Sequence, residues 1–139
     1  MTHKLFVYGT LRQGARDRLG RAARKRLSQA GIWRGTASFR GALYDLGAYP
    51  GLVETDSSVP VSGEIIDLHA PQDVFSWLDA YEGIDPLAPE TSEYKRVTRT
   101  ITGATGMLTA WVYLYRLPPS GAKRIESGNW LKHAAAKQL

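Results

Sequence analysis

The sequence contains no cysteine, which excludes disulfide bonds, thiolate metal sites and a cysteine nucleophile. Histidine is also scarce: His3, His69 and His133 are far apart and lack the spacing of a zinc site. The G-x-S-x-G signature of a serine nucleophile is missing as well. The sequence therefore predicts neither a metal site nor a catalytic triad.

Long hydrophobic runs are absent too. The opening MTHKLFVYGT has too short an apolar run for a signal peptide, and no segment could span a bilayer. We therefore expect a cytoplasmic protein with no membrane partner. The 139 residues show no repeats and no linkers, so we expect one domain over residues 1–139.

Positive charge is in excess, with a net charge of +5 and a pI of about 9.6. Much of the excess lies in RDRLGRAARKRL, residues 16–27, where Asp17 is the one acid. One interpretation is a basic helix on nucleic-acid phosphates. The other is a solvated helix face with Leu19, Ala22, Ala23 and Leu27 turned inward. Because no aromatic residue is interleaved to stack on bases, we favour the second and expect no nucleic-acid partner.

Apolar patterning and turn residues predict a strand-rich α+β domain with one well-marked helix in its middle. That helix should begin at Pro71, which suits a first helical turn, and end at Gly83. The other expected elements are a strand over 4–8, a helix in the basic segment, two or three strands within 32–53 with a turn at 47–51, a strand over 61–68, a loop over 84–92, a hairpin of strands 94–101 and 107–114, and a short helix over 127–139.

The last strand of this hairpin has two different faces. The aliphatic face suits the core, whereas the aromatic face with its hydroxyls suits either a wet rim or the wall of a pocket. The aliphatic face carries Leu108, Ala110, Val112 and Leu114, and the aromatic face carries Thr109, Trp111, Tyr113 and Tyr115.

The corner Tyr8-Gly9-Thr10-Leu11 follows the first strand directly. A glycine there lets a ligand approach the backbone, and successive N–H groups in such a turn form a site for a carboxylate or phosphate. The corner is neither a P-loop nor a dinucleotide-binding fingerprint, because the required lysine and glycine spacings are absent. A plain tight turn is the alternative interpretation.

Glu82 is the candidate for catalysis, because it prolongs the apolar stripe of Phe75 and Leu78 with a carboxylate. An apolar setting raises the pKa of a carboxyl group, which makes a competent general base near neutral pH. The alternative is that Glu82 reaches water from the helix end or bonds a backbone amide. Asp79 has room to turn toward water. No other glutamate conflicts with an apolar stripe in this way: Glu54, Glu64, Glu90, Glu93 and Glu126.

An ordered set of motifs extends from about Leu5 to Trp130: FVYGTLRQG, LYDLGAYPGLV, VSGEI, LDAYEG followed by EYKR, AWVYLY and IESGNW. Together they resemble the γ-glutamylcyclotransferase-like family, also called AIG2-like or BtrG-like. The forms YGTL and LDAYEG look closest to the branch with γ-glutamylaminecyclotransferase and small bacterial homologues. One departure is Asn129, where the family often has aspartate; we interpret this position as structural.

The resemblance implies a mixed β-barrel flanked by helices and the cyclisation of a γ-glutamyl group to 5-oxoproline with release of an amine or peptide. It implies that Glu82 is the proton acceptor and that Tyr8, Gly9, Thr10 and Leu11 bind the γ-glutamyl moiety. Tyr94, in EYKR, would be a further pocket residue. The partner would be a small-molecule substrate, and the reaction needs no cofactor. A non-catalytic γ-glutamyl-binding module is the alternative. The leaving group and the oligomeric state stay open.

Overall fold

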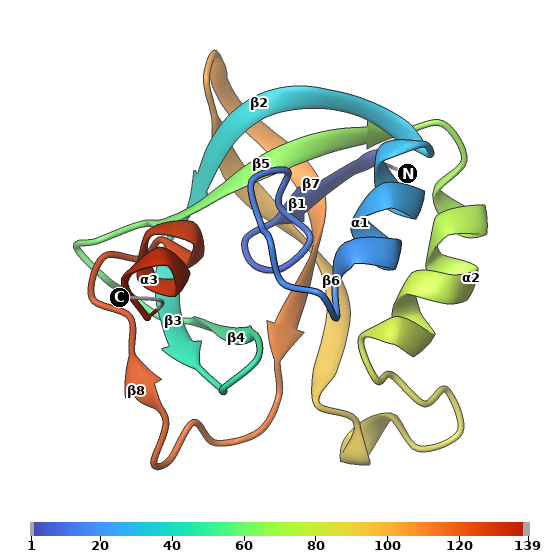
Figure 1. The fold of residues 1–139 in the computed structure, drawn as a ribbon. Helices are drawn as coiled ribbons and strands as arrows, with labels where there is room; N and C mark the ends of the chain where they lie inside the picture. The colour runs from blue at the N-terminus through green and yellow to red at the C-terminus, as the bar shows by residue number, and fades with distance from the viewer. Residues whose placement is uncertain (1, 138–139) are drawn as a thin grey trace.

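The computed structural model describes residues 2–137, and its centre is a closed five-stranded barrel in the order β1-β5-β2-β6-β7. Neighbouring strands pair antiparallel except β1 and β7, which close the barrel in parallel. The barrel is therefore mixed and helices flank it, as the family resemblance implies (Figure 1). The strands are β1 (Lys4–Val7), β5 (Val61–Leu68), β2 (Gly31–Phe39), β6 (Tyr94–Gly103) and β7 (Gly106–Tyr115).

A second, three-stranded sheet lies beside the barrel in the order β4-β3-β8, next to helix α3 (Trp130–Lys137) (Figure 1). Its strands are β3 (Gly41–Asp45), β4 (Pro50–Glu54) and β8 (Lys123–Arg124). The region 32–53 thus supplies three strands with a turn near Gly47, as predicted. β8 was not predicted, because two residues carry no periodicity and its pairing with β3 is long-range.

Helices α1 (Arg21–Ser28) and α2 (Pro71–Tyr81) lie side by side on the opposite flank (Figure 1). Alternation along β1 produces two apolar clusters: Phe6 points into the barrel, whereas Leu5 and Val7 face outward toward the helices. Fully burying one such side chain stabilises the fold by about 1.5–3 kcal/mol. α2 fixes the position of Glu82, because its inner face (Val74, Phe75, Leu78) belongs to the outer cluster.

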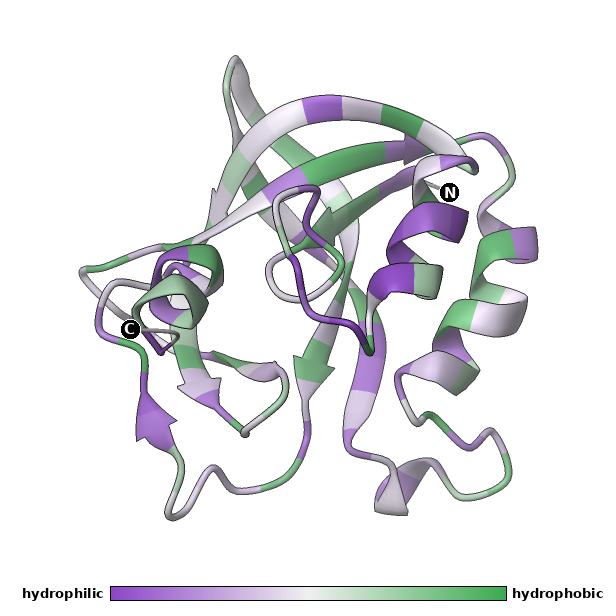
Figure 2. Cartoon of the chain, in the orientation of Figure 1, coloured by the Kyte–Doolittle hydropathy of each residue, from purple (hydrophilic) through white to green (hydrophobic). Residues whose placement is uncertain are grey.

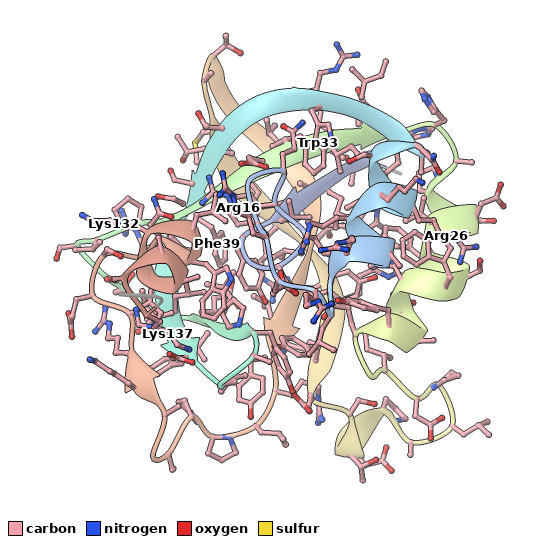
Figure 3. The ribbon with its side chains drawn as sticks, viewed as in Figure 1. Arg16, Arg26, Trp33, Phe39, Lys132 and Lys137 are labelled. Atoms are coloured by element: carbon pink, nitrogen blue, oxygen red, sulfur yellow. The ribbon has the colours of Figure 1, made fainter. Side chains whose placement is uncertain are left out.

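The basic segment is less helical than predicted. The sequence predicted a helix over residues 16–27, but α1 begins at Arg21. Asp17 is the physical reason: its carboxylate accepts hydrogen bonds from Gly20 N (2.7 Å) and Arg24 Nη1 (2.6 Å), which holds residues 17–20 in a turn. Arg16 lies in the loop before this turn, and α1 is strongly hydrophilic (Figures 2 and 3). Ala23 and Leu27 are buried as predicted, but Leu19, on the turn before the helix, and Ala22 are exposed, so the prediction that they turn inward was wrong.

The remaining elements follow the sequence closely. The hairpin strands β6 and β7 are longer than predicted and leave a two-residue turn, Ala104-Thr105. The aliphatic face of β7 lies inside the barrel, as predicted. A short 3-10 helix (Pro89–Thr91) interrupts the loop before β6. The C-terminal helix was predicted over 127–139, but α3 begins only at Trp130, because the Asn129 side chain accepts a hydrogen bond from Lys132 N (3.2 Å) and caps the helix there; residues 138–139 lie outside the described part. Within residues 2–137, no helix combines the length and hydropathy that a bilayer crossing needs.

Candidate active site

A cavity of about 380 Å³ lies between the end of β1, the end of α2 and the start of β6. The structure brings to its wall all six residues that the sequence singled out: Tyr8, Gly9, Thr10, Leu11, Glu82 and Tyr94. They come from segments more than 70 positions apart in the chain, and the pairing of β1 within the barrel brings them together. The two candidate features, the glycine corner and the glutamate at the helix end, therefore share one space.

Glu82 caps the C-terminal end of α2. Its N–H donates to Leu78 O (2.9 Å), and Gly83 follows with φ +76°, the left-handed conformation that ends a helix. No described residue donates a hydrogen bond to the Glu82 carboxylate, and no described side-chain oxygen is both fully buried and unpartnered. The carboxylate is therefore open to the cavity.

The surroundings of Glu82 disfavour its charged form. Burial raises the pKa of Glu82 to about 8, and the negative charges of Asp79 and Glu93 add to the rise. At neutral pH the group is consequently poised between its acid and base forms, which suits a group that both takes up and gives back a proton.

The corner after β1 is a tight turn in which Arg12 N donates to Gly9 O (3.1 Å). Glycine is required at position 9, because a Cβ there would approach Pro50 Cγ to 2.6 Å. Pro50 thus gives a steric reason for glycine at this position that does not depend on a ligand. The N–H groups of Gly9, Thr10 and Leu11 donate to no described residue, so three successive donors stay available at the cavity wall.

Arg24 braces this turn from α1. Its Nη1 donates to Thr10 O (2.9 Å) while the same guanidinium is bound to Asp17. Arg24 therefore supports the turn that lines the cavity from behind, without lining the cavity itself. The sequence pattern predicted a solvated face for the whole basic segment. The Leu11 side chain is buried with α1 and α2 in the outer cluster, so Leu11 meets the cavity largely through its backbone.

Tyrosines form much of the rest of the wall. Tyr8 Oη donates to Tyr113 O (2.6 Å), and Tyr94 Oη donates to Pro50 O (2.7 Å). The hydroxyl of Tyr113 donates in turn to Asp79 Oδ1 (2.7 Å). Burial raises the pKa of Tyr8, Tyr94 and Tyr113 well above the ordinary range, so the three hydroxyls stay protonated. Because these hydroxyls are committed to fixed acceptors, they stiffen the wall and are not free acids.

Sequence reasoning missed several lining residues, above all Glu93 and Tyr49. Glu93 was set aside as a loop glutamate, but it lines the cavity and accepts a hydrogen bond from Tyr49 Oη (2.7 Å). That contact, after the effect of burial, raises the pKa of Tyr49 to about 12. The signals available were the position of Glu93 in EYKR and of Tyr49 in the GAYPG turn. Tyr113, from the predicted aromatic face of β7, also lines the cavity. The other lining residues are Phe6, Val7, Leu19, Pro50, Tyr81 and Gly83.

Asp79 differs from its prediction. It does not turn toward water but is half-buried, bound by Arg96 (Nε–Oδ1 2.9 Å) and by Tyr113 Oη (2.7 Å). The partners lie on β6 and β7, so the helix pattern alone could not reveal them. Among residues 2–137 no group of three or more potential metal-ligating side chains is gathered in one place.

The structure thus combines a mixed barrel with a turn whose N–H groups bind no described residue and a glutamate without a described hydrogen-bond donor. Residues 5–132 match the sequence profile of the family described as "Gamma-glutamyl cyclotransferase, AIG2-like". The chain therefore belongs to this family.

Two relatives named for it are similar along nearly their whole length. A Vibrio cholerae protein named "Putative gamma-glutamylcyclotransferase" is 36% identical over 130 residues, which cover 94% of this chain and 96% of that protein. The "Gamma-glutamylcyclotransferase family protein YtfP" of Escherichia coli K12 is 30% identical over 136 residues, which cover 92% of this chain and 96% of YtfP.

Solved structures share the fold. The solution structure of YtfP from Escherichia coli superimposes with a TM-score of 0.62 at 31% identity, covering 94% of this chain and 98% of YtfP. The crystal structure of YkqA from Bacillus subtilis superimposes with a TM-score of 0.72 at 22% identity. That match covers 99% of this chain, but the chain spans only 43% of YkqA, so the likeness to YkqA concerns the fold alone.

Proposed function

We propose that this protein is a γ-glutamylcyclotransferase that converts a γ-glutamyl amine or peptide to 5-oxoproline and a released amine, with Glu82 as general acid and base. One observation carries the proposal: a carboxylate open to the cavity and with a raised pKa shares that cavity with three unpaired backbone N–H groups. Family membership supports the reaction class.

The chemistry needs one proton carrier and a bent substrate. The α-ammonium of the substrate gives a proton to Glu82, and the free amine attacks the γ-carbonyl carbon to close a five-membered ring. The bond from that carbon to the leaving nitrogen then breaks. The two protons lost by the attacking nitrogen end on the leaving amine, which departs as an ammonium; Glu82 carries them in turn.

The cavity fits the two charged groups of the substrate's glutamyl end. The N–H groups of Gly9, Thr10 and Leu11 would hold the α-carboxylate. Glu82 and Glu93 would face the α-ammonium, and none of the lining residues is a lysine or arginine. The aromatic wall would keep the chain of the substrate folded, so that the attacking atoms meet without a bimolecular encounter.

The test is the release of 5-oxoproline from a panel of γ-glutamyl amines, γ-glutamyl amino acids, γ-glutamyl-ε-lysine and glutathione. We expect kcat/KM on the best substrate to rise with pH to about 8, where Glu82 loses its proton. Glu82→Gln keeps size but cannot accept the proton, so turnover should fall about a hundredfold or more. Glu90→Gln, on the exposed 3-10 helix, is the matched control and should keep full activity.

Near-parental turnover in Glu82→Gln would remove Glu82 from the mechanism. Calorimetric binding of 5-oxoproline or γ-glutamyl amines without product formation at any pH would instead make the protein a γ-glutamyl-binding module.

A further inference from the structure

Asp79 is tied to the barrel by a bidentate ion pair with Arg96 of β6. The Arg96 guanidinium binds it with two parallel hydrogen bonds, Nε–Oδ1 of 2.9 Å and Nη2–Oδ2 of 3.2 Å. Tyr113 Oη donates to the same Oδ1 at 2.7 Å. Such a bidentate pair fixes orientation as well as distance. The last turn of α2 is therefore fastened to β6 and β7 at once.

Arg96 is itself held in place by two aromatic rings. Its guanidinium carbon lies 3.9 Å from the centroid of the Phe75 ring and 4.6 Å from that of Trp111. The two rings meet edge to face with centroids 5.5 Å apart. Cation–π contacts at a partly buried site add to the ion pair. Arg96 thus offers Asp79 a fixed positive charge, unlike the mobile partner of a surface salt bridge.

This contact lies next to the proposed base. Asp79 precedes Glu82 by three residues, so the two side chains are neighbours across one turn of α2. Tyr113 links the contact to the cavity: it lines the cavity, and its carbonyl accepts the hydrogen bond from Tyr8 Oη (2.6 Å). We propose that Asp79, clamped by Arg96 and Tyr113, is a positioning residue that fixes the end of α2 on the barrel and holds its carboxylate beside that of Glu82.

The charge of Asp79 acts on Glu82 together with few others. Asp79 and Glu93 both raise the pKa of Glu82 beyond the effect of burial. Three cations on the packed elements are engaged with other groups: Arg96 with Asp79, Arg24 of α1 with Asp17, and Arg26 of α1 over the Trp77 ring at 4.5 Å. Figure 3 shows Arg26 on the side of α1 that faces α2. The titratable groups facing Glu82 from the strands and the loops beside them are Tyr8, Tyr49, Glu93, Tyr94 and Tyr113.

Two substitutions should move the titration of Glu82 in opposite directions. Asp79→Asn keeps the shape but removes the negative charge and leaves Arg96 unpaired, so the acid limb of the kcat/KM profile should shift down by about one pH unit. Arg96→Met keeps an aliphatic chain between the rings but leaves Asp79 without its cation, so the limb should shift up. Arg96→Lys keeps the positive charge but loses the two parallel hydrogen bonds of the guanidinium, and its kcat/KM profile against pH should stay near the parental one. Asp73→Asn, in the first turn of α2, makes the same change of net charge and should leave the profile in place.

The activity arm of this test rests on the proposed function, so a second readout is needed. The carboxyl ¹³C resonance of Glu82, assigned by its loss in Glu82→Gln, reports the same titration without a substrate. Opposite shifts of this resonance in Asp79→Asn and Arg96→Met would support the positioning role even if no γ-glutamyl compound is turned over. Shifts of the same sign, or none, would overturn it. Lower kcat with an unmoved titration would likewise reduce Asp79 to a purely structural contact.

Discussion

At the scale of single residues, Glu82 illustrates a conflict between stability and chemistry. Its carboxylate lies among buried tyrosines and next to two other acids, with no described donor to compensate it. A carboxyl group whose pKa is higher in the folded than in the unfolded chain binds its proton more tightly when folded. Ionisation of Glu82 therefore works against the fold, and the protein keeps it at some cost in stability.

The cost can be measured through pH. The pKa of Glu82 is about 8 in the folded protein and 4.5 as the ordinary value, so its contribution to stability falls as pH rises from 4.5 to 8. We expect Glu82→Gln to raise the free energy of unfolding at pH 8 by on the order of 2–4 kcal/mol, and to have little effect near pH 4.5. Urea denaturation at both values measures this difference, with Glu90→Gln as control. A gain that does not depend on pH would contradict the assigned pKa.

The place of Glu82 beside the apolar stripe and at the cavity could be predicted because its conflict is local. Phe75, Leu78 and Glu82 share one helix, and the helix period alone places the acid on the apolar stripe. Asp79 shows the limit of the same argument. Its partners Arg96 and Tyr113 lie 17 and 34 positions away on other strands, and no local pattern distinguishes a clamped aspartate from a solvated one.

At the scale of elements, short segments are held by charged side chains more than by their own propensity. Arg24 braces the turn after β1 through its bond to Thr10 O. The buried Arg12, which follows the turn directly, holds the chain to β5 through Glu64 (3.1 Å) and also binds Asn129 (3.3 Å). Asn129 also accepts a hydrogen bond from Lys132 N (3.2 Å), so it caps α3. Its predicted structural role agrees with these contacts.

Helix α3 offers an element-scale test. His133 Nε2 lies 2.7 Å and Lys137 Nζ 3.1 Å from Asp45 Oδ2, which joins the helix to β3. Burial opposes ionisation of Asp45, but hydrogen bonds from His133, Gly47 and Lys137 outweigh it and lower the pKa of Asp45 to about 2. The ionised Asp45 and its partners therefore stabilise the fold above pH 3.8, and this contribution is lost as pH falls through about 2.

Asp45→Asn should lower the free energy of unfolding at pH 7 by about 2 kcal/mol, and this loss should disappear in acid near pH 2. Chemical denaturation followed by circular dichroism measures it. Asp56→Asn is the control, since the Asp56 side chain is 98% exposed and its pair with Arg40 is long at 3.6 Å. An equal loss in both variants would mean that α3 is not anchored through Asp45.

At the scale of the whole molecule, the strands that build the cavity were predictable, but its full lining was not. The alternation in 61–68 and in the hairpin correctly gave strands and faces. Tyr49 and Glu93 meet only because the small sheet folds back beside the barrel, and sequence patterns contain no register between strands so far apart. The excess of positive charge likewise could not be divided in advance between Arg24, which is structural, and the exposed cations of α1.

The exposed part of that charge gives a whole-molecule prediction. Arg24 is bound to Asp17 and Arg26 lies over Trp77, so two of the six cations of the basic segment are engaged within the protein. We expect little or no binding of DNA or RNA by fluorescence anisotropy, even at about 50 mM salt, where phosphate contacts are strong. Tight binding that weakens steeply with salt, and is lost in Arg16→Ala and Arg18→Ala together, would make the basic segment a nucleic-acid interface.

Closure of the barrel by β1 has a consequence for synthesis of the chain. Leu5 is paired with both Ile66 of β5 and Trp111 of β7, so β1 lacks one of its two neighbouring strands until β7 has been synthesised. Such distant pairings form late, because the chain between them must first be ordered. We therefore expect a nascent chain emerging from the ribosome to lack the cavity until residues up to Tyr115 are available, because β7 both closes the barrel and supplies Tyr113 to the cavity wall.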